Sequence, residues 1–221
     1  MERVVVCLPG STFSDKWLQA WNGLYSSLLQ EYSVECVHAS GNNIYDVRNT
    51  CVAKIAELRP PDLVLWIDSD NIVSYEGFCH LRQALLSSPD YSAVGAWYLM
   101  ETEKGEAEVT AGTGFIRPTV EQIRQANGAL MEMEYLGLGF LLMRYFLLEE
   151  LGMQPFRPER TDPNDPDSDF QMDDVSFCLA ARAKGERLFL HSGVHSQHLK
   201  LRPIPLAQFA AMPLELAEVS R

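Results

Sequence analysis

The chain has 221 residues, 47% of them hydrophobic, and a net charge of −12 at pH 7 from 18 Lys and Arg against 30 Asp and Glu. A chain of this length and composition can build its own core, which excludes the disordered, collagen-like and coiled-coil classes. The acidity disfavours non-specific binding to nucleic acid or anionic membranes, because such binding needs clustered Lys and Arg.

The chain offers no candidate for a membrane anchor or a targeting segment. Its first apolar stretch, residues 4–8, stops at Pro9 and Gly10 and is too short for a signal peptide. The longest apolar run, 138–148, contains Arg144 and is shorter than the about 20 residues that a spanning helix needs. The five scattered cysteines have no CxxC spacing and indicate reduced thiols. We therefore expect a cytoplasmic protein without a transmembrane anchor.

The first hundred residues alternate between short β-rich runs and segments of helical periodicity, the pattern of βαβ units around a parallel sheet. Ser14 and Ser74 are placed to cap the first and third helices. Ligands of such sheets bind outside the carboxyl ends of the strands, which is where Asp68 and Asp70 fall. Strands are predicted at 4–8, 34–38, 63–67 and 93–97, and helices from about 15–29, 44–58 and 75–85.

The second half is less regular. Gly137 and Gly139 precede an apolar run that we predict to be a helix from about Phe140 to Leu151. A Pro- and Asp-rich stretch then leads to a helix that opens at Asp173 or Asp174 and ends at Gly185. Two short strands are predicted near 187–190 and 193–197, and an amphipathic helix at 205–219, packed on the domain.

Two pairs of carboxylates are the main candidates for chemistry. Asp68 and Asp70, spaced i, i+2 at a strand end, suit a hard divalent cation that leaves positions open for phosphate oxygens; the alternative is turn chemistry. Asp173 and Asp174 open a helix, where one could cap the helix and the other act as a general base. The two roles are compatible.

Histidines near the end of the chain form a third candidate. A neutral imidazole from His191, His195 or His198 could complete a metal site begun by carboxylates, although His195 and His198 point to opposite faces of a strand. The acidic run of Asp165, Asp167 and Asp169 resembles a calcium loop, but a phenylalanine stands where that loop needs glycine, and a serine replaces its closing acid. We expect instead a mobile acidic loop that closes over a substrate.

In chain order, six segments resemble motifs of the GT-A glycosyltransferases, in particular the short inverting enzymes of the family-2 type, and the match covers most of residues 4–198. The segments are the opening strand VVVCLPG at 4–10, the "aRN"-like helix start at 46–49, the DXD-like LVLWIDSDN at 63–71, the "GxGF-hydrophobic-R"-like run at 135–144, the "ED"-type helix MDDVSFCLAARAKG at 172–185, and the late strand VHSQHLK at 194–200.

The resemblance implies an α/β fold, a GT-A-like (Rossmann-like) mixed and mostly parallel sheet flanked by helices, in a single domain over 1–221. Residues 1–100 would be the nucleotide-binding half, 101–200 the acceptor and catalytic half, and 201–221 a tail helix. The implied activity is a metal-dependent, inverting transfer of a sugar from a nucleotide sugar, by analogy a UDP-sugar, to an acceptor hydroxyl.

The resemblance also assigns roles to residues. Asp70 and the late His198 would bind Mn²⁺ or Mg²⁺, with Asp68 facing the donor ribose or a water on the metal. Asp174 would deprotonate the acceptor, but Asp173 stands where Glu is usual, so the choice of base between the two stays open. The remaining donor contacts would be Pro9, Arg48, Asn49 and Ser69.

Two other functions remain open. A sugar-phosphate nucleotidyltransferase also places carboxylates and a metal on an α/β sheet, but the segment after the first strand lacks its Gly-rich, basic signature. A non-catalytic module that binds a nucleotide sugar or a cation is the other. The acceptor is undetermined; the acidity disfavours nucleic acid, with a hydroxymethylated base of phage DNA kept as one option. Aromatic residues that could stack on a sugar or base, or belong to the core, are Trp97, Tyr98, Tyr135 and Phe140.

Overall fold

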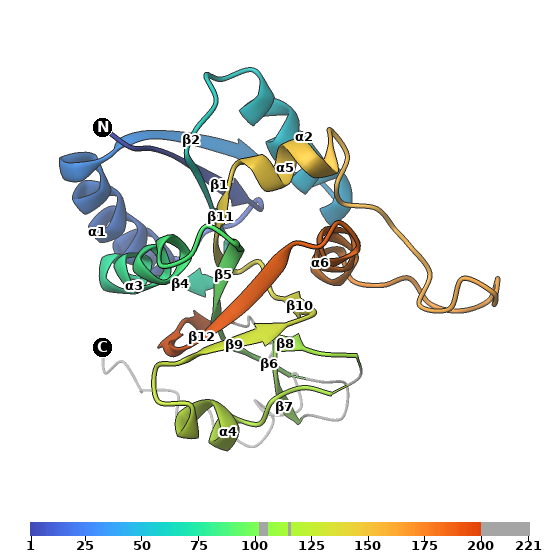
Figure 1. Cartoon of the computed structure of the whole chain (residues 1–221). Helices are drawn as coiled ribbons and strands as arrows, with labels where there is room; N and C mark the ends of the chain where they lie inside the picture. The colour runs from blue at the N-terminus through green and yellow to red at the C-terminus, as the bar shows by residue number, and fades with distance from the viewer. Residues whose placement is uncertain (102–105, 115, 200–221) are drawn as a thin grey trace, which may run out of the picture.

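A computed structural model describes residues 1–101, 106–114 and 116–199 (Figure 1). Its centre is a seven-stranded sheet in the order β2-β1-β3-β11-β5-β12-β9. Five strands run in the same direction, while β11 and β9 run antiparallel to their neighbours. The predicted mixed, mostly parallel sheet is therefore confirmed. The strands are β1 (Arg3–Pro9), β2 (Ser33–Ala39), β3 (Leu63–Ile67), β5 (Tyr91–Trp97), β9 (Leu130–Met133), β11 (Phe140–Arg144) and β12 (Arg187–His195).

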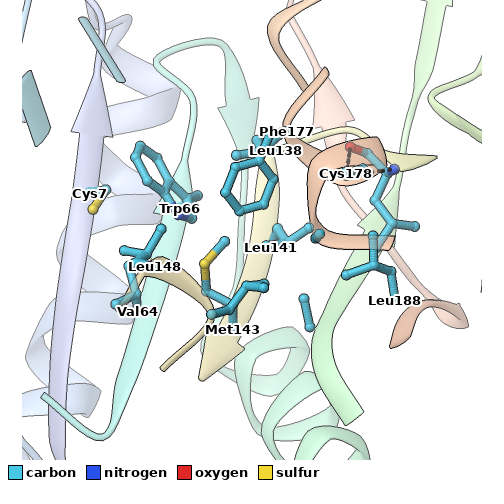
Figure 2. Packing of buried hydrophobic residues seen from close by; sticks show 14 of the residues in the cluster. Cys7, Val64, Trp66, Leu138, Leu141, Met143, Leu148, Phe177, Cys178 and Leu188 are labelled. Atoms are coloured by element: carbon cyan, nitrogen blue, oxygen red, sulfur yellow. Dashed lines mark hydrogen bonds between the residues drawn. The ribbon is translucent and has the colours of Figure 1, made fainter. Parts of the chain in front are cut away.

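Helices cover both faces of this sheet. The buried residues of α1 and α3 pack in one apolar cluster on one face, and those of α2, α5 and α6 pack in a second cluster on the other. Figure 2 shows the second cluster, where Trp66 and Met143 of the sheet lie near Phe177 of α6. The helices are α1 (Asp15–Glu31), α2 (Ile44–Ala56), α3 (Tyr75–Leu86), α4 (Val120–Gln125), α5 (Phe146–Leu151) and α6 (Asp173–Ala183).

Three two-stranded ladders supplement the central sheet. β4 (Asn71–Ile72) pairs with β13 (Gln197–His198), β6 (Leu99–Glu101) with β7 (Ala107–Val109), and β8 (Ala111–Gly112) with β10 (Tyr135–Leu136). The β4–β13 ladder joins the segment directly after β3 to the segment directly after β12. Two chain segments more than 120 residues apart are thus held side by side.

Local sequence signals explain the boundaries of the helices in the first half. The Ser14 hydroxyl accepts a hydrogen bond from the Trp17 amide, and the Ser74 hydroxyl accepts one from Gly77, as expected of N-caps. At α6 the prediction of a side-chain cap is wrong, because its N-cap is Met172 and no side chain caps it. Asp173 and Asp174 are therefore not needed as helix caps.

The prediction of a helix from Phe140 to Leu151 is wrong over its first half. Residues Phe140–Arg144 form β11 in the middle of the sheet, and only Phe146–Leu151 is helical. β11 pairs with β3 and β5 at its two edges, and its two faces pack in the two apolar clusters, so its four apolar residues are at most 1% exposed. A strand buried on both faces is continuously apolar, a pattern that a buried helix shares.

The end of the described chain differs from the prediction in one further respect. The two strands expected near 187–190 and 193–197 are one strand, β12, whose register shifts between Leu190 and His195. The predicted helix at 205–219 lies outside the described residues. None of the helices in the described ranges has the length and apolarity that crossing a membrane requires.

Candidate functional site

The loop after β3 carries the Asp68-Ser69-Asp70 motif, and hydrogen bonds to its backbone from three other parts of the chain fix it. The Asp68 amide donates to the Gly139 carbonyl (3.1 Å), and the Trp17 indole donates to the Asp68 carbonyl (2.9 Å). The Leu199 amide donates to the Asp70 carbonyl (2.7 Å). The loop is therefore a rigid platform at the carboxyl end of the sheet, where ligands of such sheets bind.

Asn71 connects this loop to the strand that carries His198. Its amide nitrogen donates to Asp70 Oδ1 (3.3 Å), and its oxygen accepts from the Ser196 hydroxyl (2.8 Å). In the β4–β13 ladder His198 lies opposite Asn71. A Cβ at Gly139 would lie 2.4 Å from the Asn71 side chain, so this position requires glycine.

Asp70 and His198 lie side by side as a result. Asp70 Oδ2 is 3.0 Å from His198 Nε2, and His198 Nδ1 is 3.1 Å from the Leu99 carbonyl oxygen. Because a carbonyl only accepts hydrogen bonds, Nδ1 carries the proton, which leaves the Nε2 lone pair of a neutral imidazole facing a carboxylate oxygen. Two acceptors that face each other in this way are satisfied by a proton on either group or by a cation bound between them.

This pair fits a divalent cation. Two adjacent ligands of an octahedral ion at about 2.1 Å are about 3 Å apart, close to the observed separation. The hydrogen bond from Nδ1 to a carbonyl is the usual orientation device of a metal-binding histidine. Within the described ranges no group of three or more His, Cys, Asp or Glu side chains is placed to hold a metal. A pair that leaves most positions to water and phosphate oxygens suits Mg²⁺ or Mn²⁺ bound together with a nucleotide.

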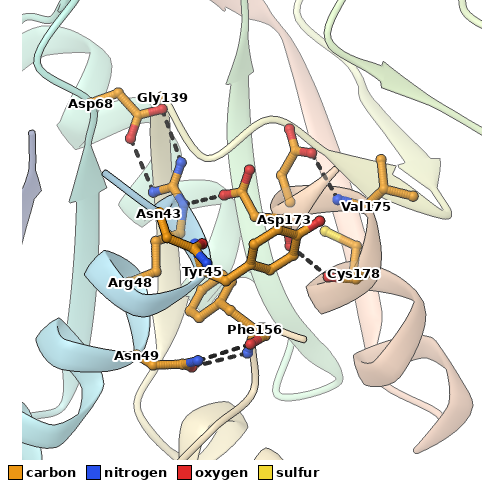
Figure 3. Close-up of polar contacts among 12 residues, drawn as sticks. Asn43, Tyr45, Arg48, Asn49, Asp68, Gly139, Phe156, Asp173, Val175 and Cys178 are labelled. Carbon is orange, nitrogen blue, oxygen red and sulfur yellow. Dashed lines mark hydrogen bonds and ion pairs between the residues drawn. The ribbon is translucent and has the colours of Figure 1, made fainter. Parts of the chain in front are cut away.

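Arg48 of α2 links Asp68 to Asp173 (Figure 3). Its Nη1 and Nη2 lie 3.0 and 3.1 Å from the two Asp68 carboxylate oxygens, and its Nε donates to Asp173 Oδ2. Arg48 and Asp173 are both buried. The Asp68 carboxylate therefore faces a guanidinium, and Arg48 is committed to two carboxylates of the protein.

Asp174 is the carboxylate with the altered acidity. It is half-buried, and its Oδ1 accepts a hydrogen bond from the Val175 amide (2.8 Å). Burial and the neighbouring charge of Asp173 raise the pKa of Asp174 to about 7, although the Arg48 guanidinium acts in the opposite direction. A carboxylate that titrates near neutral pH is suited to act as a general base.

These residues line one cleft of about 300 Å³. Pro9 lies on its wall with Gly10, whose φ of +133° and close approach to the Ser69 side chain exclude a larger residue. The structure brings eight of the nine predicted site residues to this cleft: Pro9, Arg48, Asp68, Ser69, Asp70, Asp173, Asp174 and His198.

Asn49 is the exception. Its amide group donates to the Phe156 carbonyl (2.8 Å) and accepts from the Phe156 amide (3.1 Å), so its hydrogen bonds hold the segment after α5 rather than facing the cleft. The other two candidate histidines also lie apart from it. His195 packs against Trp97 with a ring separation of 4.3 Å, and His191 stacks on His80 at 5.9 Å.

Several cleft residues were not predicted. Met100, Thr110 and Arg117 come from the segment with the small β6–β7 and β8–β10 ladders, whose short strands carry no motif. Of the four aromatic candidates, Tyr98 and Tyr135 line the cleft. The other two do not: Phe140 belongs to the core, and the Trp97 indole donates to the Ser192 carbonyl.

The acidic loop projects from the body of the molecule between α5 and α6 (Figure 1). Asp165 and Asp167 are exposed, and the Asp167 amide donates to the Asp165 side chain, as in an Asx turn. The Thr161 amide donates to the Asp169 carbonyl (2.8 Å), which closes the loop on itself. Closure of this loop over a substrate stays a prediction.

No protein-family model and no curated protein sequence matches the chain. Solved structures do. A197 from STIV matches 91% of this chain and 87% of its own, with a TM-score of 0.59 and 12% identity. S. aureus TarS in complex with UDP-GlcNAc matches over 94% of this chain and 61% of its own (TM-score 0.54, 11% identity). GalNAc-T7 with UDP, GalNAc and Mn²⁺ matches over 93% and 45% (TM-score 0.52, 10% identity).

These likenesses establish the fold. The chain has a GT-A-like α/β fold, with a mixed sheet and helices on both faces, which it shares with TarS and GalNAc-T7. It spans about half of the GalNAc-T7 chain and three fifths of the TarS chain.

Proposed function

We propose that this protein is a metal-dependent, inverting glycosyltransferase that moves a sugar from a UDP-sugar to an acceptor hydroxyl. The observation that carries the proposal is the content of one cleft: the Asp70–His198 pair, 3.0 Å apart, shares it with Asp174, whose pKa is raised to about 7. UDP is taken from TarS and GalNAc-T7, both solved with UDP or a UDP-sugar.

Asp70 and His198 would hold the cation, Mn²⁺ or Mg²⁺. Bound there, the cation supplies positive charge that neutralises the departing diphosphate. Asp68 has a different role, because both of its oxygens face Arg48. Its contribution to the metal is through the shape of the loop rather than through a ligand bond.

Asp174 is assigned as the base. It accepts the proton of the acceptor hydroxyl while that oxygen attacks the anomeric carbon from the face opposite the diphosphate, which leaves with the electron pair of the broken C–O bond. One displacement inverts the configuration at that carbon. Asp173 is unsuited to this step, because its carboxylate accepts the hydrogen bond of Arg48 Nε. Its charge instead helps to raise the pKa of Asp174.

The test is release of UDP from a panel of UDP-sugars, with and without Mn²⁺, for the wild type and for Asp70→Ala and Asp174→Asn. Asp90→Asn, at an exposed position just before β5 and outside the cleft, is the matched control. We expect Mn²⁺-dependent release that both cleft variants lose and the control keeps. Release of pyrophosphate from a sugar phosphate and UTP would indicate a nucleotidyltransferase instead.

Binding is measured on the same variants by the thermal shift with Mn²⁺ and UDP. We expect Asp174→Asn to keep this shift and Asp70→Ala to lose it. A wild type that binds Mn²⁺ and UDP but releases no UDP from any donor and acceptor tested would be a binding module, and the proposal would be wrong.

A further inference from the structure

Arg48 lies at the wall of the cleft but is itself buried. Only 4% of it is exposed, and its guanidinium carbon lies 5.6 Å from the ring centre of Trp66 and 5.9 Å from that of Phe156. A charge removed from water is tolerated only where it is paired and hydrogen-bonded. Among the residues that the structure describes, Asp68 and Asp173 are the carboxylates that pair with Arg48.

The two partners of Arg48 come from different parts of the fold, and both line the cleft. Asp68 belongs to the loop after β3, which also carries Asp70, and Asp173 is the first residue of α6, next to Asp174. Both Asp68 oxygens are within 3.1 Å of the two Nη atoms, which leaves Nε for Asp173. This planar fork reaches both carboxylates at once, whereas the ammonium of a lysine is a single point charge.

Neighbouring contacts show that this arrangement is built into the fold. Asn49, the next residue on α2, holds the backbone of Phe156 through two hydrogen bonds. The Phe156 ring stacks on Phe177 of α6 at 4.7 Å. Phe156 thus links α2 to α6, and in Figure 3 it lies below the Arg48 ion pairs.

We propose that Arg48 is a positioning residue that bridges the cation-binding loop and the base-bearing helix, and that it does not contact the nucleotide. The effect of this bridge on catalysis rests on the proposed function. The bridge itself, the pairing of Arg48 with Asp68 and Asp173, does not. The Arg48 guanidinium faces the carboxylates of Asp68 and Asp173. All three charges influence the pKa of Asp174. Removing Asp173 or Arg48 must therefore move the titration of Asp174 in opposite directions.

The first test needs no activity. The side-chain carboxyl carbon of Asp174 is followed by NMR from pH 4 to 9, with its signal assigned by its loss in Asp174→Asn. In Asp173→Asn we expect the midpoint to fall by about one pH unit, because a like charge is removed. In the double variant Arg48→Met with Asp173→Asn, the midpoint should lie about one pH unit above that of Asp173→Asn.

The double variant is chosen because Arg48→Met alone leaves two buried carboxylates without a cation and is the change least compatible with folding. Identical midpoints in Asp173→Asn and in the double variant would overturn the proposal. So would an Asp173→Asn midpoint equal to that of the wild type.

The second test is kinetic and uses Arg48→Lys, which keeps the charge. We expect kcat to fall about tenfold or more with the donor KM within twofold, because lysine cannot fix both carboxylates. Arg144→Lys is the control, since Arg144 is a partly buried arginine that binds only backbone carbonyls away from the cleft. A raised donor KM with unchanged kcat would make Arg48 a nucleotide contact and refute the positioning role.

The two proposals fail separately. A wild type without transfer activity, but with the expected order of NMR midpoints, rejects the proposed function and retains the link through Arg48. Transfer activity in a protein whose Asp174 midpoints are the same in all variants supports the proposed function and rejects the link through Arg48.

Discussion

Replacing Asp174 with asparagine should stabilise the protein in a pH-dependent way. The ordinary pKa of the carboxyl is 3.8, and in the folded protein burial and the Asp173 charge raise it to about 7. Each pKa unit corresponds to about 1.4 kcal/mol, so ionised Asp174 costs the folded state up to about 4 kcal/mol. Asparagine removes this cost and can keep the hydrogen bond from the Val175 amide, which Asp174 now accepts through Oδ1.

The sign follows from proton linkage. Below about pH 4 the carboxyl is protonated in both states and has no effect on stability. Between about pH 4 and pH 7 the unfolded chain loses this proton first, so the wild type loses stability as the pH rises, and above about pH 7 the loss is complete. The advantage of Asp174→Asn should therefore grow from near zero at pH 4 to its full value at pH 8.

The assay is urea unfolding of both proteins at half-unit steps from pH 4 to 8.5, without added metal. Asp165→Asn, which removes an exposed carboxylate of the same type, is the control and should show no such trend. A difference between Asp174→Asn and the wild type that stays constant with pH, or a wild type that is the more stable at pH 8, would refute the reasoning. Under the proposed function the same variant should lose about 10²- to 10⁴-fold in transfer rate.

Three further changes test the fold and the site. Phe140→Ala should cost about 3–5 kcal/mol of unfolding free energy in urea, since the ring is fully packed in β11; a loss below about 1 kcal/mol would contradict that position. Gly139→Ala should weaken the thermal shift with Mn²⁺, because its Cβ would displace the Asn71 side chain. Gly23→Ala is the control: a Cβ there meets open space in α1, so the variant should keep the thermal shift and gain about 0.5–1 kcal/mol of stability. Asn49→Ala should cost about 1–3 kcal/mol but leave the Kd for UDP unchanged; a tenfold weaker Kd would restore Asn49 as a nucleotide contact.

The first half of the fold could be predicted because its signals are local. Each strand is a short apolar run, each helix has one apolar face, and serine caps mark the start of α1 and α3. The strand predicted at 63–67 stops where the polar Asp68-Ser69-Asp70 motif begins, and β3 has the same boundaries in the structure. Nothing distant was needed to place these elements.

β11 could not be predicted in this way. Its leucine-rich sequence has good helix propensity, and its burial on both faces removes the alternation that marks a half-buried strand. Only its pairing with β3 and β5 makes it a strand. Tertiary contacts therefore override local propensity at the strand that precedes the shortened helix α5.

The site was predictable in its chemistry but not in its pairings. Residue types and strand ends pointed to Asp70 and Asp174, yet no local pattern pairs Arg48 with residues 20 and 125 positions away. The same limit applies to Asn49. The resemblance to the family motif predicted that it contacts the donor nucleotide, but in the structure its side chain is hydrogen-bonded to the backbone of Phe156. Which side chains become partners depends on the topology of the fold, so a local sequence pattern does not predict these pairs.

Asp174 also bears on whether the cleft catalyses a reaction or only binds. A binding module gains nothing from a half-buried carboxylate beside a second one, because ionising it lowers stability and asparagine would fill the same space. Strongly perturbed carboxylates of this kind are concentrated at sites of proton transfer, where function opposes stability. Asp174→Asn separates the two cases: a transferase should gain stability, keep its affinity for Mn²⁺ and UDP and lose turnover, whereas a binding module should gain stability and lose nothing.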